Sequence, residues 1–364
     1  MFPHFANSKL LVHEHDANVN SKGKYGETAL LNAAAGGHID VIRFHVDEHA
    51  TDVNSKNEYG WAALKIATVN VHMDVLRFVV DEHNADINAI DNEGGTALMV
   101  AATTGNLEII RFLVEHGAEV NAKDNNGQTA LLMAASNGRM NISQFLVKYG
   151  ADVNAKDDYG YTALLMAAAS GRMNITQFLV EHGAEVNAID NDESTPLLKA
   201  AGKGYIDIVR FLVDKRGTDV YCKDNDGWTP LMRAVDGGHV DTVRFLVENG
   251  RADVNIHNKS GHTAMKIAAD RGYQDIQRLL TPFVAATQSK TYRAATAIAT
   301  ASDVPMDIAS SWFISPSEVE LIDFVDSGNV GGEFRARWLD ADAALKLFLP
   351  DTTSHATFED EVHL

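Results

Sequence analysis

The chain has almost no cysteine and no long apolar run. Cys222 is the only cysteine among 364 residues, so neither an intramolecular disulfide nor a cluster of thiolate metal ligands can form within the chain. This favours a reducing compartment, and we expect a cytoplasmic protein, with the nucleus as a second location. Nowhere do about 18 apolar residues follow one another, as a membrane-spanning helix requires. Residues 1–16 also lack the basic and apolar regions of a secretory signal, so neither membrane insertion nor secretion is expected.

Basic residues are also scarce. The chain holds 31 Lys and Arg against 50 Asp and Glu, which gives a formal net charge of −19. Affinity for nucleic acid depends on basic side chains that neutralise phosphates, so nucleic acid is not an expected partner. The remaining composition, 45% hydrophobic and 22% charged, is that of an ordinary soluble protein, in a chain too long for one compact core. We expect two or more units.

A repeat of 33 or 34 residues organises the first three quarters of the chain. In most units a turn glycine stands shortly before a Thr-Ala-Leu or Thr-Pro-Leu segment, and Glu193 occupies that place in one unit. The glycines are Gly26, Gly60, Gly94, Gly127, Gly160, Gly227 and Gly261. A fixed period of this length is typical of stacked repeats, in which each unit buries its apolar surface against its neighbours.

One unit, residues 124–156, shows how each repeat should fold. Its residues 124–127 are four turn formers in a row. Thr129 stands where a helix N-cap belongs, which predicts a short helix over 130–136. Apolar residues at helical spacing predict a second helix over 140–148. Each repeat is therefore expected to be a loop followed by a pair of short helices.

The order of these motifs resembles the ankyrin repeat at nearly every position. A unit runs Gly-x-Thr-Pro/Ala-Leu, Ala-Ala, Gly-His or similar, Phe-Leu-Val and Gly-Ala-Asp/Glu-Val-Asn, and residues 228–250 are among the closest copies. The resemblance covers about residues 5–281, as half a repeat followed by eight repeats. It implies an all-α repeat solenoid over residues 1–281, which binds proteins through its hairpin tips and the concave ends of its first helices.

Some positions depart from this pattern. In the second unit Ala62 and Val71 stand where Thr and a helix-ending Gly are usual, so we expect a local dip in stability. We expect the chain to start inside a repeat, with a second helix but no first one. Because Pro282 cannot continue a helix, the array is expected to stop near Thr281.

No catalytic or metal site is expected in the array. Histidines at 13–15, 47–49 and 81–83 fall one group to each second-helix end, too far apart to converge on one zinc ion. We interpret them as helix-terminal residues near the negative end of the helix dipole. The acidic turns lack the spacing and the bidentate Glu of a calcium loop. No set of nucleophile, His and acid stands out from the repeats, so neither an enzyme nor a bound cofactor is expected.

Protein binding is expected at the hairpin tips, because aromatic residues flank the turn glycines where stacking does not require apolar side chains. Large aromatics dominate interface hot spots. With Gln128, the expected binding residues are Tyr25, Tyr59, Trp61, Tyr159, Tyr161 and Trp228. Their polar neighbours, which favour a basic or mixed partner surface, are Asn125, Asn126, Asn137, Asp158, Asp226 and Asp236. The alternative is that the aromatics only brace adjacent hairpins. We expect the array to act as a monomer.

The character of the chain changes after residue 281. Residues 282–311 are rich in Ala, Thr and Ser without helical or strand periodicity, and are expected to form a flexible linker. Short apolar or alternating stretches at 317–325, 333–340 and 343–349 then predict three antiparallel strands.

Residues 312–364 resemble the start of a protein kinase N-lobe of the tyrosine-kinase-like serine/threonine group, which often carries ankyrin repeats upstream. A strand leads to Gly-x-x-Gly, then Phe-Arg-x-x-Trp, Ala-Ala-Leu-Lys and Phe-Glu-Asp-Glu-Val. The resemblance implies that Gly328 and Gly331 match two glycines of the loop that covers ATP phosphates. It also implies that Lys346 matches the phosphate-binding lysine and Glu361 the glutamate that holds it.

Two substitutions and the missing second lobe count against this nucleotide site. Asp326 replaces the first loop glycine, and Glu333 replaces the usual Val beneath adenine. The sequence contains no catalytic loop, no Asp-Phe-Gly motif and no second lobe, so the β-rich fragment is expected to be vestigial and to bind ATP and magnesium only if it were complete. The overall prediction is a non-catalytic, protein-binding scaffold. Two alternatives stay open: a segment of a longer ankyrin-repeat kinase, and a pseudokinase that still binds nucleotide.

Overall fold

The computed structural model describes residues 18–215, 217–250 and 252–284, and the backbone of three strands within 319–347. Contacts divide the chain into two compact units, Met1–Leu280 and Thr281–Leu364, and each is considered by itself. The half repeat expected before residue 18 and most of the linker expected after residue 281 lie outside the described residues.

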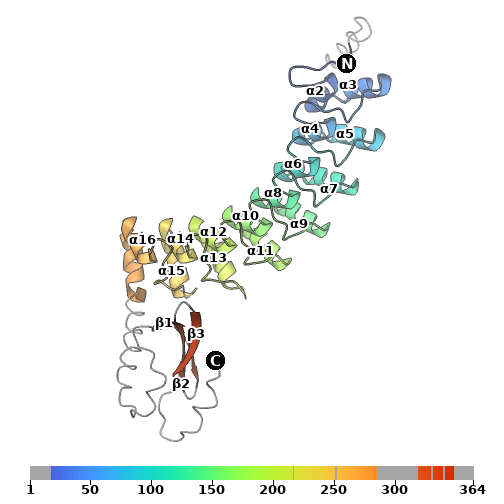
Figure 1. Ribbon diagram of the computed structural model, residues 1–364. Helices are drawn as coiled ribbons and strands as arrows, with labels where there is room; N and C mark the ends of the chain where they lie inside the picture. Colours follow the sequence, from blue (N-terminus) through green and yellow to red (C-terminus); the bar gives the residue numbers. More distant parts are fainter. Residues whose placement is uncertain are drawn as a thin grey trace, which may run out of the picture. The chain divides into compact units, whose positions relative to one another are not determined.

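The first unit is a single file of helix pairs (Figure 1). The first helices of the pairs contact one another in order along the file; they are α2 (Ala29–Gly36), α4 (Ala63–Asn70), α6 (Ala97–Thr104), α8 (Ala130–Ser136), α10 (Ala163–Ala169), α12 (Pro196–Lys203), α14 (Pro230–Asp236) and α16 (Ala264–Asp270). The second helices are α3 (Ile39–Arg43), α5 (Met73–Arg77), α7 (Leu107–Glu115), α9 (Met140–Lys148), α11 (Met173–Glu181), α13 (Ile206–Val213) and α15 (Val240–Glu248). The helices predicted over 130–136 and 140–148 are confirmed by α8 and α9.

Threonine side chains begin most of the first helices. The Oγ1 atom of Thr129 accepts a hydrogen bond from the backbone N–H of Leu132, as predicted for an N-cap. The same bond is made by Thr28, Thr96, Thr162, Thr195, Thr229 and Thr263. By contrast, Ala62 begins α4 without a capping bond, and Val71 ends α4 in the left-handed region at φ 61°. A β-branched residue is strained in that region, so both ends of α4 lack the usual stabilisation.

Alanine and leucine fill the space between successive first helices. In α8, Leu131, Ala134 and Ala135 are at most 1% exposed. The small alanine side chains allow neighbouring helices to approach closely, and the leucines supply the apolar area that burial removes from water, worth about 25 cal/mol per Å². Each pair is too thin to bury these residues alone, so the core exists only because the pairs stack.

The difference between 33-residue and 34-residue units lies at the end of the second helix. In a 33-residue unit, the N–H of Ala118 donates to the carbonyl of Leu113, five residues back, at 2.9 Å. In a 34-residue unit, the N–H of Ala85 donates to Val79, six residues back, at 2.8 Å. The π-helical turns η1 (Phe44–Glu48) and η2 (Phe78–Glu82) continue α3 and α5 in the first two such units. The wider turn absorbs the extra residue, so the next repeat keeps its place in the file.

The last described stretch of the array corrects one expectation. Pro282 was expected to end the helix near Thr281, but the backbone is helical over 274–284. Proline removes one hydrogen-bond donor, and the neighbouring residues keep helical geometry despite that loss. Ile276 and Leu280 are at most 1% exposed, so this helix packs on the file like the earlier second helices.

The second unit contains a three-stranded antiparallel sheet in the order β1, β2, β3. Strand β1 (Val319–Gly328) pairs with β2 (Gly331–Trp338), and β2 pairs with β3 (Ala341–Leu347). Gly328 is opposite Gly331 at the end of the first hairpin.

Candidate functional site

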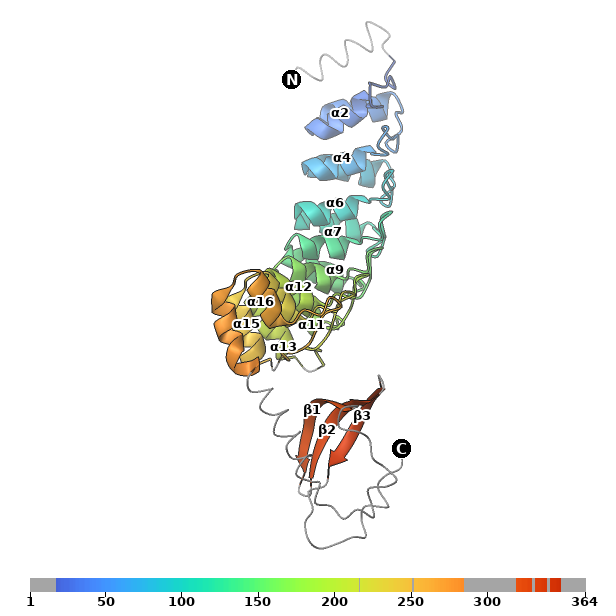
Figure 2. The same cartoon turned by 60° about the vertical axis from the view of Figure 1, so that its left-hand side comes forward.

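The loops between helix pairs are joined into a continuous ladder. The backbone N–H of Asp158 donates to the carbonyl of Asn126 in the preceding hairpin at 2.9 Å. The side-chain Nδ2 of Asn191 then donates to the carbonyl of Asp158, also at 2.9 Å. Figure 2 shows these loops along one side of the file. We call the two residues before each turn-glycine position, together with Glu193 at the position that lacks a glycine, the tip row, and the ladder gives this row a fixed backbone.

Three of the predicted aromatic residues stand in the tip row and are exposed. Tyr25, Tyr59 and Tyr159 expose 43%, 56% and 61% of their surface. The ring centroids of Tyr25 and Tyr59 lie 6.3 Å apart, so these two rings contact each other across adjacent hairpins. Large exposed rings on a rigid backbone lose little conformational entropy on binding, which suits interface anchors.

The other three predicted aromatics are half-buried, and each contacts a cation of the array. The Nζ atom of Lys65 lies 5.7 Å from the ring centroid of Trp61, the Nζ atom of Lys199 lies 5.0 Å from that of Tyr161, and the Cζ atom of Arg233 lies 4.8 Å from that of Trp228. At these distances the ring face attracts the cation. The contacts give these three half-buried rings a structural role within the array.

Each of the three cations is also paired with an aspartate at the base of a hairpin. The pairs are Lys65 with Asp91, Lys199 with Asp190 at 2.6 Å, and Arg233 with Asp224, whose Oδ2 accepts from Nε at 2.9 Å. The other carboxylate oxygen of each aspartate accepts two backbone N–H groups of its own loop. These pairs therefore tie the turn of the hairpin to a first helix.

The pKa shifts of two members show that the charged forms are favoured. Burial raises the pKa of the Asp91 carboxyl, but the hydrogen bond from Lys65 and those from the loop backbone lower it further, so the net pKa lies below its usual value. Burial lowers the pKa of Lys199, but its hydrogen bonds with Asp190 and Tyr161 outweigh burial and raise the pKa overall. These shifts favour the charged carboxylate of Asp91 and the charged ammonium of Lys199.

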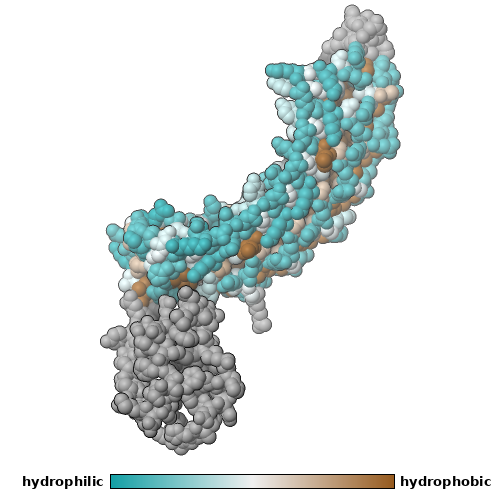
Figure 3. All heavy atoms as spheres, viewed as in Figure 1, coloured by the Kyte–Doolittle hydropathy of each residue, from teal (hydrophilic) through white to brown (hydrophobic). Residues whose placement is uncertain are grey.

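The tip row is acidic over most of its length. From residue 58 to residue 226 its charged members are all exposed carboxylates: Glu58, Glu93, Asp158, Asp192, Glu193 and Asp226. Glu193 adopts φ 57° at the place of the missing turn glycine. Figure 3 shows a largely hydrophilic face over the array, with hydrophobic colour in separated spots.

Several predicted polar residues are used within the array. Asn125 donates through Nδ2 to the carbonyl of Asn92 at 3.0 Å, and Asn137 donates to that of Met133 at 2.8 Å. Asp236 pairs with Arg271. The backbone N–H of Gln128 donates to Asp124 at 2.8 Å, and Gln128 itself is half-buried. Asn126, Asp158 and Asp226 remain exposed in the tip row.

Histidines at the second-helix ends contact their own helix and the preceding repeat. Nδ1 of His116 lies 2.7 Å from the carbonyl oxygen of Phe112, one turn earlier, and Nε2 lies 2.9 Å from Asp81. Nε2 of His83 lies 3.0 Å from Asp47. Of the histidines in the helix-terminal prediction, the structure describes His49 and His83, which are the C-cap residues of η1 and η2. Within the described residues, no group of three or more His, Cys, Asp or Glu side chains could hold a metal ion.

The single cysteine, Cys222, has a thiol of low reactivity. Its Sγ lies 3.2 Å from Oγ1 of Thr195, and burial raises the pKa of the Cys222 thiol to about 11. The thiol is therefore protonated at neutral pH and is not a nucleophile. In the described part of the chain, no helix is both long and apolar enough to cross a membrane.

Comparison with known protein families shows the family to which this chain belongs. The family described as ankyrin repeats (3 copies) matches residues 4–91, 83–157, 155–224 and 216–289. The chain belongs to the ankyrin-repeat family. No curated protein matches the sequence. The matched segments end at residue 289, and no enzyme domain is detected, so the kinase resemblance of residues 312–364 is not supported.

The residues named for that resemblance do not form a described site. Gly328 pairs with Gly331, and Lys346 is opposite Glu333 in the register of β2 and β3. Glu361 lies outside the described residues.

Sequence reasoning missed the cations beneath the aromatic rings. Lys65 stands at the position that Leu132 has in α8, whereas Lys199 and Arg233 stand at the position of Met133, and both positions are apolar in most other first helices of the ankyrin array. A basic residue at either position, together with Asp at the start of the following hairpin for Lys65 or of the preceding hairpin for Lys199 and Arg233, is the signal that would have revealed these pairs.

Proposed function

We propose that this ankyrin-repeat protein is a non-catalytic scaffold that captures a protein partner on its tip row. The observation that carries the proposal is the combination of exposed tyrosines and carboxylates on a backbone held by the inter-hairpin ladder. A rigid surface pays less ordering entropy on association than a mobile loop does. The array of residues 1–281 would supply the binding surface, and residues 282–311 would link it to the β-rich segment of residues 312–364.

The chemistry of the tip row favours a partner with basic and apolar groups side by side. Tyr59 and Tyr159 would act as anchors, because large aromatic side chains dominate binding hot spots. The carboxylates of Glu58 and Asp158 stand next to them and would attract Lys or Arg, mainly by raising the association rate. Trp61, Tyr161 and Trp228 would support the surface from below, through their contacts with the array cations.

The test is a comparison of captured proteins between matched variants. Tyr59→Ser with Tyr159→Ser removes two exposed rings, and surface substitutions of this kind change stability by about 0.5 kcal/mol or less. We expect the double variant to lose most of its specific partner while its far-UV helix signal stays unchanged. Arg244→Gln removes one side of an exposed pair with Glu248 on α15 and serves as the control. Equal capture by all three proteins would reject the tip row as the binding surface.

A further inference from the structure

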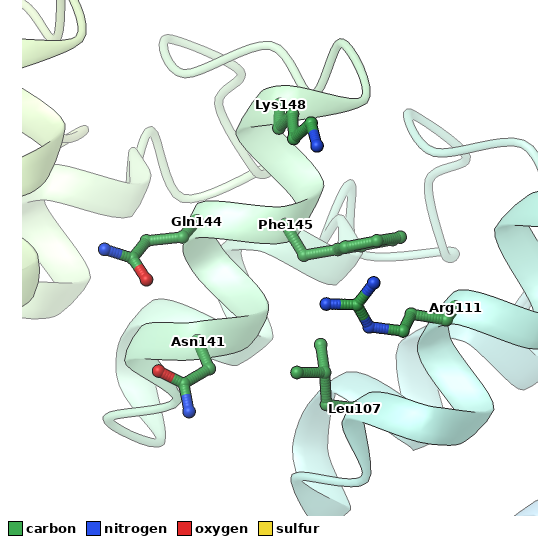
Figure 4. Close-up of a pocket in the computed structure, with 6 residues that line it drawn as sticks. All are labelled: Leu107, Arg111, Asn141, Gln144, Phe145 and Lys148. Carbon is green, nitrogen blue, oxygen red and sulfur yellow. The ribbon is translucent and has the colours of Figure 1, made fainter.

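A second surface lies on the second helices of the repeats, between α7 and α9. There the two second helices leave a groove of about 310 Å³ (Figure 4). It is lined by Leu107, Arg111, Asn141, Gln144, Phe145 and Lys148. In Figure 4 the guanidinium of Arg111 lies beside the ring of Phe145, while the amides of Asn141 and Gln144 extend from α9.

The charge of this groove is opposite to that of the tip row. Its lining contains two cations and two amides but no carboxylate. Arg111 and Lys148 are both exposed, and neither forms an ion pair with any described residue. The guanidinium of Arg111 lies 5.1 Å from the ring centroid of Phe145, which holds it over the groove without neutralising it.

The equivalent groove in the first repeat shows that this arrangement is not a general feature of the array. That groove, about 190 Å³, is lined by Asp40, Arg43, Phe44, Asp47 and Glu48. Arg43, the one cation among the described lining residues, makes two hydrogen bonds to Glu82 of the next repeat, at 3.0 and 2.8 Å. Three carboxylates and an arginine that is already paired make this described part of the groove unfavourable for an anionic ligand.

The sequence of α9 explains the difference. The second residue of α3, α5, α7, α13 and α15 is Asp or Glu, whereas it is Asn141 in α9 and Asn174 in α11. The residue eight positions after the start of each second helix is acidic in its neighbours, such as Glu115 and Glu181, but it is Lys148 in α9. Two substitutions therefore remove negative charge from one groove and add a positive charge.

We propose that the groove between α7 and α9 binds an acidic peptide segment of a second protein partner. A planar guanidinium binds a carboxylate through two parallel hydrogen bonds, and the ammonium of Lys148 offers a second anchor at the other end of the groove. The amides can donate to the peptide backbone, and Leu107 and Phe145 give apolar contact to its side-chain stems. The net charge of the chain does not prevent this, because at physiological salt charges are screened beyond about 8 Å.

This inference goes beyond the proposed function. The tip row would take a basic or mixed surface, and the groove would take an acidic segment. The two sites lie on different parts of each repeat, so one array could hold two partners of opposite charge at the same time. In that case the scaffold would join proteins that do not bind each other directly.

A direct binding measurement tests the groove with the full chain. The probe is a fluorescent peptide that alternates Glu with Leu, and its matched control carries Gln in place of every Glu. By fluorescence anisotropy we expect the Glu peptide to bind and the Gln peptide to bind at least tenfold more weakly, since each tenfold corresponds to about 1.4 kcal/mol. Arg111→Gln with Lys148→Gln should weaken binding of the Glu peptide by about tenfold or more.

Two further variants separate this inference from the others. Arg43→Gln, in the acidic groove, should leave the affinity for the Glu peptide unchanged. Tyr59→Ser with Tyr159→Ser should also leave it unchanged, so failure of the tip-row proposal would not affect this result. The inference is overturned if the Gln peptide binds as tightly as the Glu peptide. It is equally overturned if the Arg111 and Lys148 double variant, with an unchanged far-UV helix signal, keeps full affinity.

Discussion

Lys65 of α4 and Asp91 of the following hairpin form an ion pair across a repeat boundary, and each side chain is only 8% exposed. Lys65 also donates to the carbonyl of Gly95 at 2.8 Å, and the carboxylate accepts the N–H groups of Glu93 and Gly95. The second repeat, which lacks a threonine cap and ends α4 at a strained valine, is thus joined to the third by a buried charge pair.

Removing the charge of Asp91 should destabilise this boundary. Asp91→Asn keeps an oxygen for the loop N–H groups, as the natural Asn57 does in the second hairpin, but leaves Lys65 buried without its anion. We expect a loss of about 2 kcal/mol in the free energy of unfolding, measured by urea titration. The matched control is Asp124→Asn, since Asp124 occupies the same loop position and has no cation partner among the described residues. Equal losses in both variants would contradict the account.

The ion pair of Lys65 and Asp91 also predicts that the stability of the protein depends on pH. The folded pKa of Asp91 lies below its usual value, so its contribution to stability is fully present above that usual value, and is lost as the pH falls through the folded pKa. As the pH falls below the usual carboxyl pKa of about 3.8, the wild type should therefore lose more stability than Asp91→Asn. The check is a series of thermal unfolding curves from neutral to strongly acidic pH. A constant difference between the two proteins would show that the ion pair contributes nothing.

Repairing the two ends of α4 should stabilise the second repeat. Ala62→Thr restores the capping hydroxyl found in the other first helices, and Val71→Gly relieves a β-branched residue at positive φ. Each change should add about 1 kcal/mol. Amide hydrogen exchange of α4 and α5 measures the effect locally, and Thr96→Ala, which deletes the cap of α6, should give the opposite sign. Unchanged exchange in both repaired variants would exclude weak ends as a cause of local instability.

His45 is a buried polar residue where the next repeats place Val79 and Leu113. It is 2% exposed, and neither ring nitrogen has a hydrogen-bond partner. Burial, with a smaller contribution from His49, lowers the pKa of His45. The neutral ring is favoured in the fold, so stability is lost as the pH falls below the unfolded value of about 6.5.

Replacing His45 with valine should remove both the unsatisfied ring and this pH dependence. We expect His45→Val to gain about 1 kcal/mol at neutral pH, and more at pH 5.5, by urea titration at each pH. A gain that is the same at both pH values would mean that protonation of His45 does not limit the first repeat.

The sequence alone predicted the features that depend on residues close together in the chain, and it missed those that depend on contacts between repeats. The helices over 130–136 and 140–148 were predictable because Thr129 and the apolar spacing act within a few residues. The pair of Lys65 and Asp91 was not, since it joins residues 26 positions apart and depends on how two repeats stack. The burial of Trp61 follows from that stacking as well. The helical backbone at Pro282 was missed because packing of Leu280 can outweigh the loss of one hydrogen bond.

The central claim, that the tip row binds a protein partner, is tested most directly by site-specific crosslinking. A photoreactive benzoyl-phenylalanine placed at Tyr59 or Tyr159 should crosslink to one partner in cell extract. At Tyr221, an equally exposed residue outside the tip row, it should not. We predict the same crosslinked protein from both tip positions, with loss of the product when excess unlabelled wild-type protein competes. A product that forms from Tyr221 and not from either tip position would contradict the account.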